Sequence, residues 1–225
     1  MPDLRAAIII DYQNVHLVGH GLYATTRYLP KHETLIDPLL FAGNLLRERN
    51  AAQRPGMDHA VLRQVEVFSG QPSPDHDPRG YARRQAQKAQ WERDKRVSVT
   101  LRALKYEYQR DASGQFVTDV DGKRMPTGSP REKGVDVMCA LAAVRAAQDP
   151  SVDLVILASS DSDLEPAVDE VRRLGTAKIE TFCWWDETTK IGYRIHPSDR
   201  SRPMWSTKLP EGVFRACADP TVYKQ

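Results

Sequence analysis

The sequence is poor in the features that mark secreted and membrane proteins. Among its 225 residues are only three cysteines, Cys139, Cys183 and Cys217, with no close pair among them. A disulfide framework and a cysteine zinc site are therefore not expected. No run approaches about 18 uncharged apolar residues, which excludes a membrane-spanning helix. The N-terminal stretch also lacks the basic and apolar regions of a signal peptide. We therefore expect a cytoplasmic protein with no membrane partner.

Net charge is also small, because 32 basic residues face 30 acidic ones. With 40% apolar and 28% charged residues, the composition is that of an ordinary folded domain. The basic residues gather between Arg79 and Arg110, where ten of them face three acids. Such a stretch is most often a solvated helix surface. Beside an acidic reaction centre it could instead follow a nucleic-acid backbone, with Arg83, Arg84 and Lys88 as the candidate contacts.

Short apolar runs alternate with helical patterns along the chain. The runs predict strands at residues 6–10, 62–68, 97–104, 154–158 and 178–183. The helical patterns cover residues 38–49, 79–96, 134–148 and 162–174. The first and fourth runs have no polar alternation, which is typical of strands covered on both faces. The order predicts an α/β fold, a doubly wound central parallel sheet with helices on both faces.

We expect a single domain over residues 1–225, with a core at about 4–185. An insertion at 105–131 contains turn signals near Gly114 and Gly122 and is read as an antiparallel flap. A C-terminal extension, 186–225, is expected to wrap the surface through residue 208 and to end in a short docked element. The six histidines show no metal-ligand spacing and are read as surface or turn residues. Gly19 and Gly21 weaken the helical pattern around His16 and His20.

Acidic residues stand where two of the predicted strands end. Asp11 follows the first strand, and Asp161 and Asp163 follow the fourth. Asp136 opens the helix that leads into the fourth strand. Ligands of parallel sheets bind outside the carboxyl ends of strands, where the strand order reverses. If these two strands are neighbours, the acids meet in one crevice, and a divalent cation would relieve their mutual repulsion.

Each acid alone also has a structural interpretation. Asp11, Asp161 or Asp163 could cap a helix, and Asp136 could be an acid favoured in a first helical turn. Asn14 could be a capping or turn residue. It is their conjunction that favours a reaction centre. A Toprim-like site is disfavoured, because it would place Glu where Asp11 stands.

Three stretches resemble, in order, the motifs of the NYN domain family, part of the PIN-like nuclease superfamily. They are IIIDYQNVH at 8–16, EKGVDVMCALAAV at 132–144 and ASSDSDLEPAVDEVRRLG at 158–175. Ser160 and Leu164 replace the Gly and Phe that are frequent in the family, which leaves the acids in place. The resemblance implies a doubly wound fold and a metal-dependent ribonuclease. It implies an acidic cluster of Asp11, Asp136, Asp161 and Asp163.

The resulting hypothesis is a Mg²⁺- or Mn²⁺-dependent ribonuclease, with endonuclease the favoured mode. Catalysis and metal binding are assigned to Asp11, Asp136, Asp161 and Asp163, the last of which could hold a second ion or orient water. Substrate contacts are assigned to Asn14, Ser159 and Lys133, whose ammonium would neutralise phosphate charge, and to Arg83, Arg84 and Lys88. RNA is the expected partner, and formation of a homodimer is left open. The alternative is an inactive RNA- or protein-binding module.

Overall fold

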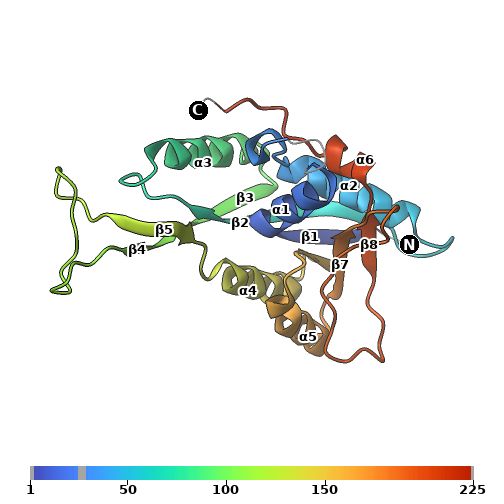
Figure 1. Cartoon of the computed structure of the whole chain (residues 1–225). Helices are drawn as coiled ribbons and strands as arrows, with labels where there is room; N and C mark the ends of the chain where they lie inside the picture. The colour runs from blue at the N-terminus through green and yellow to red at the C-terminus, as the bar shows by residue number, and fades with distance from the viewer. Residues whose placement is uncertain (1–2, 25–28, 224–225) are drawn as a thin grey trace.

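A six-stranded parallel sheet organises residues 3–24 and 29–223, the part of the chain that this computed structural model describes. The strands of the sheet are β1 (Leu4–Asp11), β2 (Ala60–Gln71), β3 (Val97–Ala103), β6 (Leu154–Ala158), β7 (Lys178–Trp184) and β8 (Ser206–Leu209). The helices are α1 (Tyr12–Tyr23), α2 (Pro38–Ala51), α3 (Pro78–Trp91), α4 (Val135–Gln148), α5 (Glu165–Leu174) and α6 (Glu211–Ala216). Two single 3₁₀ turns are η2 (Lys31–Glu33) and η3 (Ser162–Leu164). Helices cover both faces of the sheet, as predicted (Figure 1).

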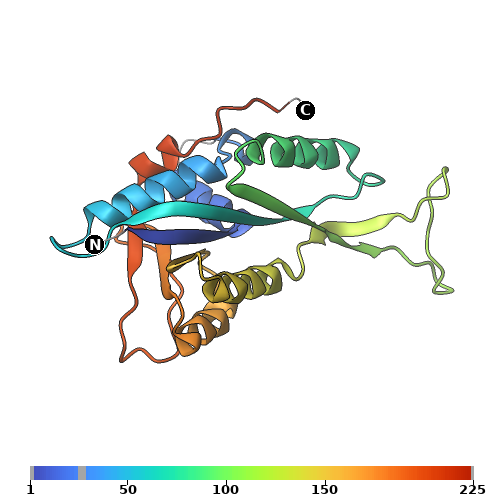
Figure 2. The same ribbon diagram turned by 180° about the vertical axis from the view of Figure 1, so that it is seen from behind.

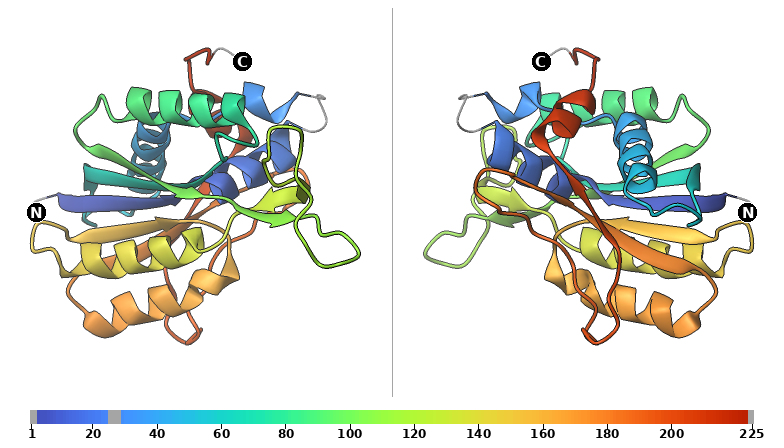
Figure 3. Two further views of the ribbon diagram at one scale, coloured as in Figure 1. Left: turned by 90° about the vertical axis from the view of Figure 1, so that its left-hand side faces the viewer. Right: turned by 90° about the vertical axis from the view of Figure 1, so that its right-hand side faces the viewer.

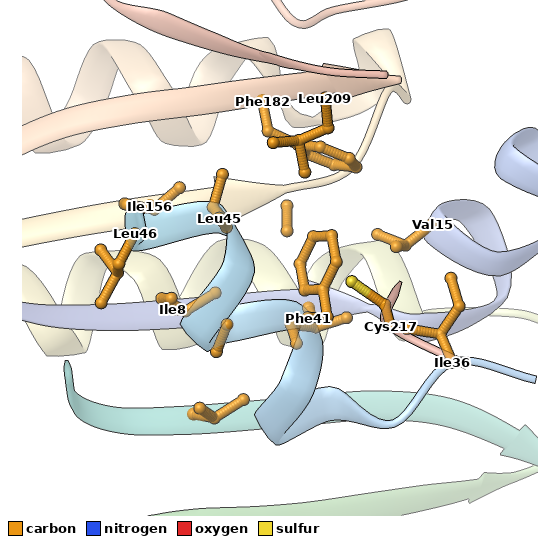
Figure 4. Close-up of a cluster of buried hydrophobic side chains, with 14 of the residues drawn as sticks. Ile8, Val15, Ile36, Phe41, Leu45, Leu46, Ile156, Phe182, Leu209 and Cys217 are labelled. Atoms are coloured by element: carbon orange, nitrogen blue, oxygen red, sulfur yellow. The ribbon is translucent and has the colours of Figure 1, made fainter. Parts of the chain in front are cut away.

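Each face of the sheet has its own apolar core. Ile8 and Ile10 of β1 pack among α1, α2 and α6, whereas Ala7 and Ile9 pack against α4 and α5. Both faces of β1 are therefore buried, which explains its uninterrupted apolar run. Figures 2 and 3 show the two helical layers on opposite sides of the sheet. Figure 4 shows the first core, where Phe41 and Leu45 of α2 lie over the sheet.

The strand order reverses between the two strands that end in acids. The order across the sheet is β3-β2-β1-β6-β7-β8, and Ile10 of β1 is paired with Ala158 of β6. The condition that the first and fourth predicted strands be neighbours is thus met. Their carboxyl ends form the switch point at which α/β sheets bind ligands.

The insertion forms an antiparallel arm, also as expected. β4 (Lys105–Tyr108) pairs with β5 (Pro126–Arg131), and the arm projects well beyond the sheet (Figure 1). Farther out, isolated bridges join Arg110 to Phe116 and Thr118 to Arg124. The guanidinium carbons of Arg110 and Arg124 lie 4.0 and 4.1 Å from the centre of the Phe116 ring. These contacts stiffen an arm that has little apolar core of its own.

The interpretation of His16 and His20 as surface or turn residues is wrong. Both lie on α1 and are buried, and a ring nitrogen of each lies within hydrogen-bond distance of Thr34 Oγ1, at 3.2 and 2.9 Å. Gly19 fits this helix because a Cβ atom there would lie 2.5 Å from the Phe214 ring of α6. The glycine therefore permits close packing between α1 and α6.

Two further elements differ from expectation. The predicted surface segment ends in β8, whose Thr207 is buried and which pairs in parallel with β7 at the sheet edge. The helix predicted over 79–96 ends at Trp91, because residues beyond it turn into β3. A buried ion pair that the pattern did not show joins Arg49 of α2 to Glu180 of β7, at 2.8 Å. No helix within the described residues is long and apolar enough to cross a bilayer.

Candidate acidic site at the sheet switch point

Asp11 lies at the centre of the switch point. It is the last residue of β1 and the N-cap of α1, and it is only 6% exposed. Its carboxylate accepts hydrogen bonds from the Asn14 backbone N–H, at 3.3 Å, and from Ser159 Oγ, at 3.1 Å. The second bond ties the end of β1 to the residue that follows β6. One carboxylate thus starts a helix and joins the two strands on which the strand order reverses.

The residues after β6 extend this network. The Ser160 N–H and hydroxyl both lie close to Asn14 Oδ1, at 2.8 and 2.9 Å. Ser159 Oγ accepts from the Asp161 N–H at 3.1 Å, and Asp161 accepts from the Asp163 N–H at 3.0 Å. Asp161 is therefore the N-cap of η3, the turn before α5, and not of α5 itself, the capping role that the sequence left open. Asp11, Asn14, Ser159 and Asp161 form one connected group.

Electrostatics distinguish Asp11 from an ordinary capping residue. Burial raises the pKa of its carboxyl from 3.8 to about 6. Hydrogen bonds from Asn14 and Ser159 oppose the rise, and the negative charges of Asp161 and Asp136 add to it. The carboxylate is thus held in a place that disfavours its charge. Such perturbed groups gather at functional sites, although structural networks also produce them.

Asp136 reaches this region from the first turn of α4. The residue before that helix, Gly134, has a φ of +80°, a backbone conformation that glycine adopts without strain. This turn carries the chain from the arm into α4 and sets the position of Asp136. Its charge acts on Asp11 across the carboxyl edge of the sheet.

Sequence reasoning missed Glu132, which lies at the same edge. Its Oε2 accepts from the Gly70 N–H of β2 at 2.8 Å. Burial raises the pKa of Glu132, and the charges of Asp11 and Asp136 contribute to the rise. Glu132 lies inside the second motif, next to Lys133, so its identity was in view. The sequence could not show where the Glu132 side chain points, because that depends on how the arm returns to the sheet.

The other predicted site residues lie around this group at different places. Asp163 and Lys133 are exposed at the rim. Arg83 and Arg84 are on α3 and face a cavity beside α1. Lys88 lies farther along α3, where its ammonium donates to the Val99 carbonyl at 2.5 Å. The structure therefore separates Lys88 from the two arginines with which the sequence grouped it.

The carboxylates share an edge of the sheet without forming a closed cage. Within residues 3–24 and 29–223, no three His, Cys, Asp or Glu side chains lie close enough together to hold a metal ion. Oxygen donors suited to a hard cation are nevertheless present, with Asp11, Ser159 and Asp161 in one hydrogen-bonded group. Mg²⁺ commonly takes one or two protein carboxylates and completes its shell with water and phosphate oxygens. The donor chemistry fits an ion of this kind.

Comparison with known proteins agrees with the motifs. The sequence model of the NYN domain matches residues 5–190. The chain belongs to the NYN domain family. Membership places it with the PIN-like nucleases, and the match spans β1, the acidic edge and the arm.

Other comparisons add little to this NYN assignment. A solved structure of a protein of unknown function from Vibrio parahaemolyticus is 21% identical to the chain. The alignment covers 80% of this chain and 81% of that one, with a TM-score of 0.40, too low to support an argument. No match was found among curated proteins.

Proposed function

We propose that this NYN domain is a divalent-metal-dependent ribonuclease, acting as an endonuclease, with its reaction centre at Asp11. The observation that carries the proposal is the buried Asp11 carboxylate, which meets the charges of Asp161 and Asp136 at the switch point. A folded protein gains no stability from acids gathered in this way. A cation bound between them and an RNA phosphate would make the arrangement favourable.

Mg²⁺ or Mn²⁺ would be held by Asp11 with Asp161 or Asp136, directly or through water. When bound, the ion would activate water and stabilise charge on the phosphate. Asp163, exposed beside Asp161, would orient the attacking water or contribute to a second ion site. The rigid hydrogen bonds of Asp11 with Ser159 and of Asp161 with Asp163 would hold the carboxylates in place.

Neutral Asn14 and cationic Lys133 would position the substrate. Asn14 accepts from Ser160 through Oδ1, so its amide NH₂ is the end that can donate to a phosphate oxygen. Lys133 is exposed at the rim, where its ammonium can approach a phosphate without losing an internal partner. Its charge would oppose the negative charge that develops in the transition state.

One observation favours the second candidate, an inactive RNA- or protein-binding module. It is the lack of a three-ligand metal cage within the described residues. A phosphate would then approach the acidic edge without a cation to neutralise it, which is electrostatically unfavourable. We therefore favour the nuclease.

The test is cleavage of a labelled RNA that contains single-stranded and structured regions, in Mn²⁺, Mg²⁺ or EDTA. Cleavage should require metal and be lost in Asp11→Asn and Asp161→Asn. Asp199→Asn, in the loop before β8, is the matched control and should cut as the wild type does. Metal-dependent cleavage that persists in Asp11→Asn would refute the assignment. Absence of both cleavage and metal binding in the folded wild type would favour the module.

A further inference from the structure

A cavity of about 300 Å³ opens beside the acidic edge, on the α1 and α3 side of the sheet. The first two turns of α1, the η2 region, Pro72 and residues 80–87 of α3 line it. Its charged or polar lining includes His16, Lys31, Arg83, Arg84 and Gln87. Among the described residues that line it, none is acidic. The cavity therefore presents positive charge next to an edge that presents negative charge.

Arg84 is the residue that makes this cavity more than a basic surface. Its Nη1 donates to Gln87 Oε1 at 2.9 Å, and its guanidinium carbon lies 5.5 Å from the centre of the Tyr12 ring. Within the described chain, no Asp or Glu oxygen lies within 4.0 Å of its nitrogens. A guanidinium carries five N–H donors, so Arg84 retains donors for a ligand.

The electrostatic environment of Arg84 also favours a bound anion. Burial lowers the pKa of its guanidinium and the charge of Arg83 adds to this, whereas the charge of Glu132 opposes it. Burial also lowers the pKa of His16 to about 4, and the positive charges of Arg84 and Lys31 contribute. His16 is therefore neutral at physiological pH. A partly buried guanidinium with no carboxylate in direct contact is most readily stabilised by a ligand that is anionic and accepts several hydrogen bonds.

The position of the cavity relates it to the reaction centre. Tyr12, on its wall, directly follows Asp11, and Pro72 directly follows the end of β2. Glu132 is close enough for its charge to interact with both Asp11 and Arg84. The basic cavity and the acidic edge thus lie side by side at the carboxyl ends of β1 and β2.

We propose that this cavity binds a phosphate of the RNA strand next to the one that is cut, with Arg84 as its principal ligand and Arg83 and Lys31 as supporting charges. The inference rests on the proposed function for RNA as the ligand and for the statement that the neighbouring phosphate is cut. Planar N–H pairs of arginine match the oxygens of a phosphate in a way that an ammonium does not. The phosphate contact would fix the register of the strand over Asp11.

The test measures RNA binding in EDTA, so it does not depend on cleavage. A labelled single-stranded oligonucleotide is titrated with wild type, Arg84→Gln, Arg83→Gln and Arg93→Gln. Arg93 is exposed just beyond the far end of α3 and is the charge-matched control. We expect Arg84→Gln to weaken binding about tenfold and to reduce the salt slope of log K by about one. Arg93→Gln should remain within about twofold of wild type.

A second experiment identifies which phosphate the cavity binds. Single phosphates of the oligonucleotide are replaced in turn by neutral methylphosphonates. At one position the substitution should weaken wild-type binding and have no further effect on Arg84→Gln. Where Arg84→Gln fails to fold, as judged by thermal melting, Arg83→Gln must show the loss of affinity for the proposal to hold.

Unchanged RNA binding by folded Arg84→Gln and Arg83→Gln would overturn the proposal. Inorganic phosphate that shifts the Arg84 side-chain NMR signals while RNA does not would also overturn it, and would identify a site for free phosphate. Loss of RNA affinity in Arg84→Gln without any cleavage by wild type would refute the nuclease alone. Cleavage with unchanged affinity in the arginine variants would refute the cavity alone.

Discussion

Asp11→Asn should stabilise the metal-free protein near neutral pH. The pKa of Asp11 is raised from 3.8 to about 6, a difference of about two pH units. One unit corresponds to about 1.4 kcal/mol, so the ionised carboxylate lowers the free energy of unfolding by about 3 kcal/mol. Because the folded-state pKa is raised, this loss is absent below pH 3.8, grows through pH 6 and is complete above it.

Asparagine is suited to this test because it keeps the shape of the side chain. Its oxygen can still accept from the Asn14 N–H, and Asn is as good an N-cap as Asp. The assay is urea unfolding of both proteins in EDTA between pH 4 and 8. The difference in unfolding free energy should rise from near zero at pH 4 to about 3 kcal/mol at pH 7.5. Asp153→Asn is a control of opposite sign, since the side-chain bond from Arg5 lowers the pKa of Asp153.

Bound metal should make wild type more stable than Asp11→Asn, the reverse of the order expected in EDTA. An ion that binds only the folded state stabilises it according to its concentration and Kd. Excess Mn²⁺ should therefore raise the melting temperature of wild type and leave Asp11→Asn nearly unchanged. If Asp11→Asn is less stable than wild type at pH 7.5 in EDTA, the charge of Asp11 is not a burden and the reasoning fails.

Three further predictions concern stability away from the acidic edge. Gly19→Ala should destabilise the protein by about 1–3 kcal/mol by overpacking against α6. Gly21→Ala, whose Cβ meets nothing within 4 Å, should instead stabilise it by up to about 1 kcal/mol, and thermal melting separates the two. Glu180→Gln should cost about 3–5 kcal/mol in urea unfolding because it leaves the Arg49 charge buried, and a change under 1 kcal/mol would contradict this. Burial lowers the pKa of His16 to about 4, so wild type should lose about 3 kcal/mol as pH falls from 6.5 to 4, and His16→Gln should lack this contribution.

The sequence was most informative where burial leaves no choice of residue. β1 and β6 lie in the middle of the sheet with both faces covered, so each had to be an uninterrupted apolar run. Their carboxyl ends then placed Asp11 and Asp161 at one edge by topology alone. This reasoning needed no side-chain detail, which is why the location of the acidic group could be predicted.

Prediction failed where long-range contacts override local preference. His16 and His20 are buried because Thr34, from a separate segment, provides a hydrogen-bond partner for their rings. β8 is a short edge strand whose sequence, STKL, has only two buried positions. Its pairing is decided by β7 and not by its own composition.

The basic residues of α3 illustrate a limit of a different kind. Arg83, Arg84 and Lys88 are close in sequence, yet the arginines line the cavity and the lysine contacts β3. Composition identified the helix as basic but could not assign side chains to directions, because these depend on where α1 lies. The cavity itself is built from four separate parts of the chain, and no local motif describes it.

The hydrogen bonds of Asp11 explain its geometry but not its charge. Capping α1 is a task that a neutral asparagine oxygen performs as well, although Ser159 donates to the second carboxylate oxygen, which asparagine lacks. The negative charge is a net penalty in the isolated protein, since burial and the charges of Asp161 and Asp136 together outweigh the hydrogen bonds from Asn14 and Ser159. A charge that the fold does not require, placed beside a basic cavity at the switch point, is best explained by a cation that it serves to bind. A functional test must therefore remove the charge of Asp11 more than its hydrogen bonds, as Asp11→Asn does.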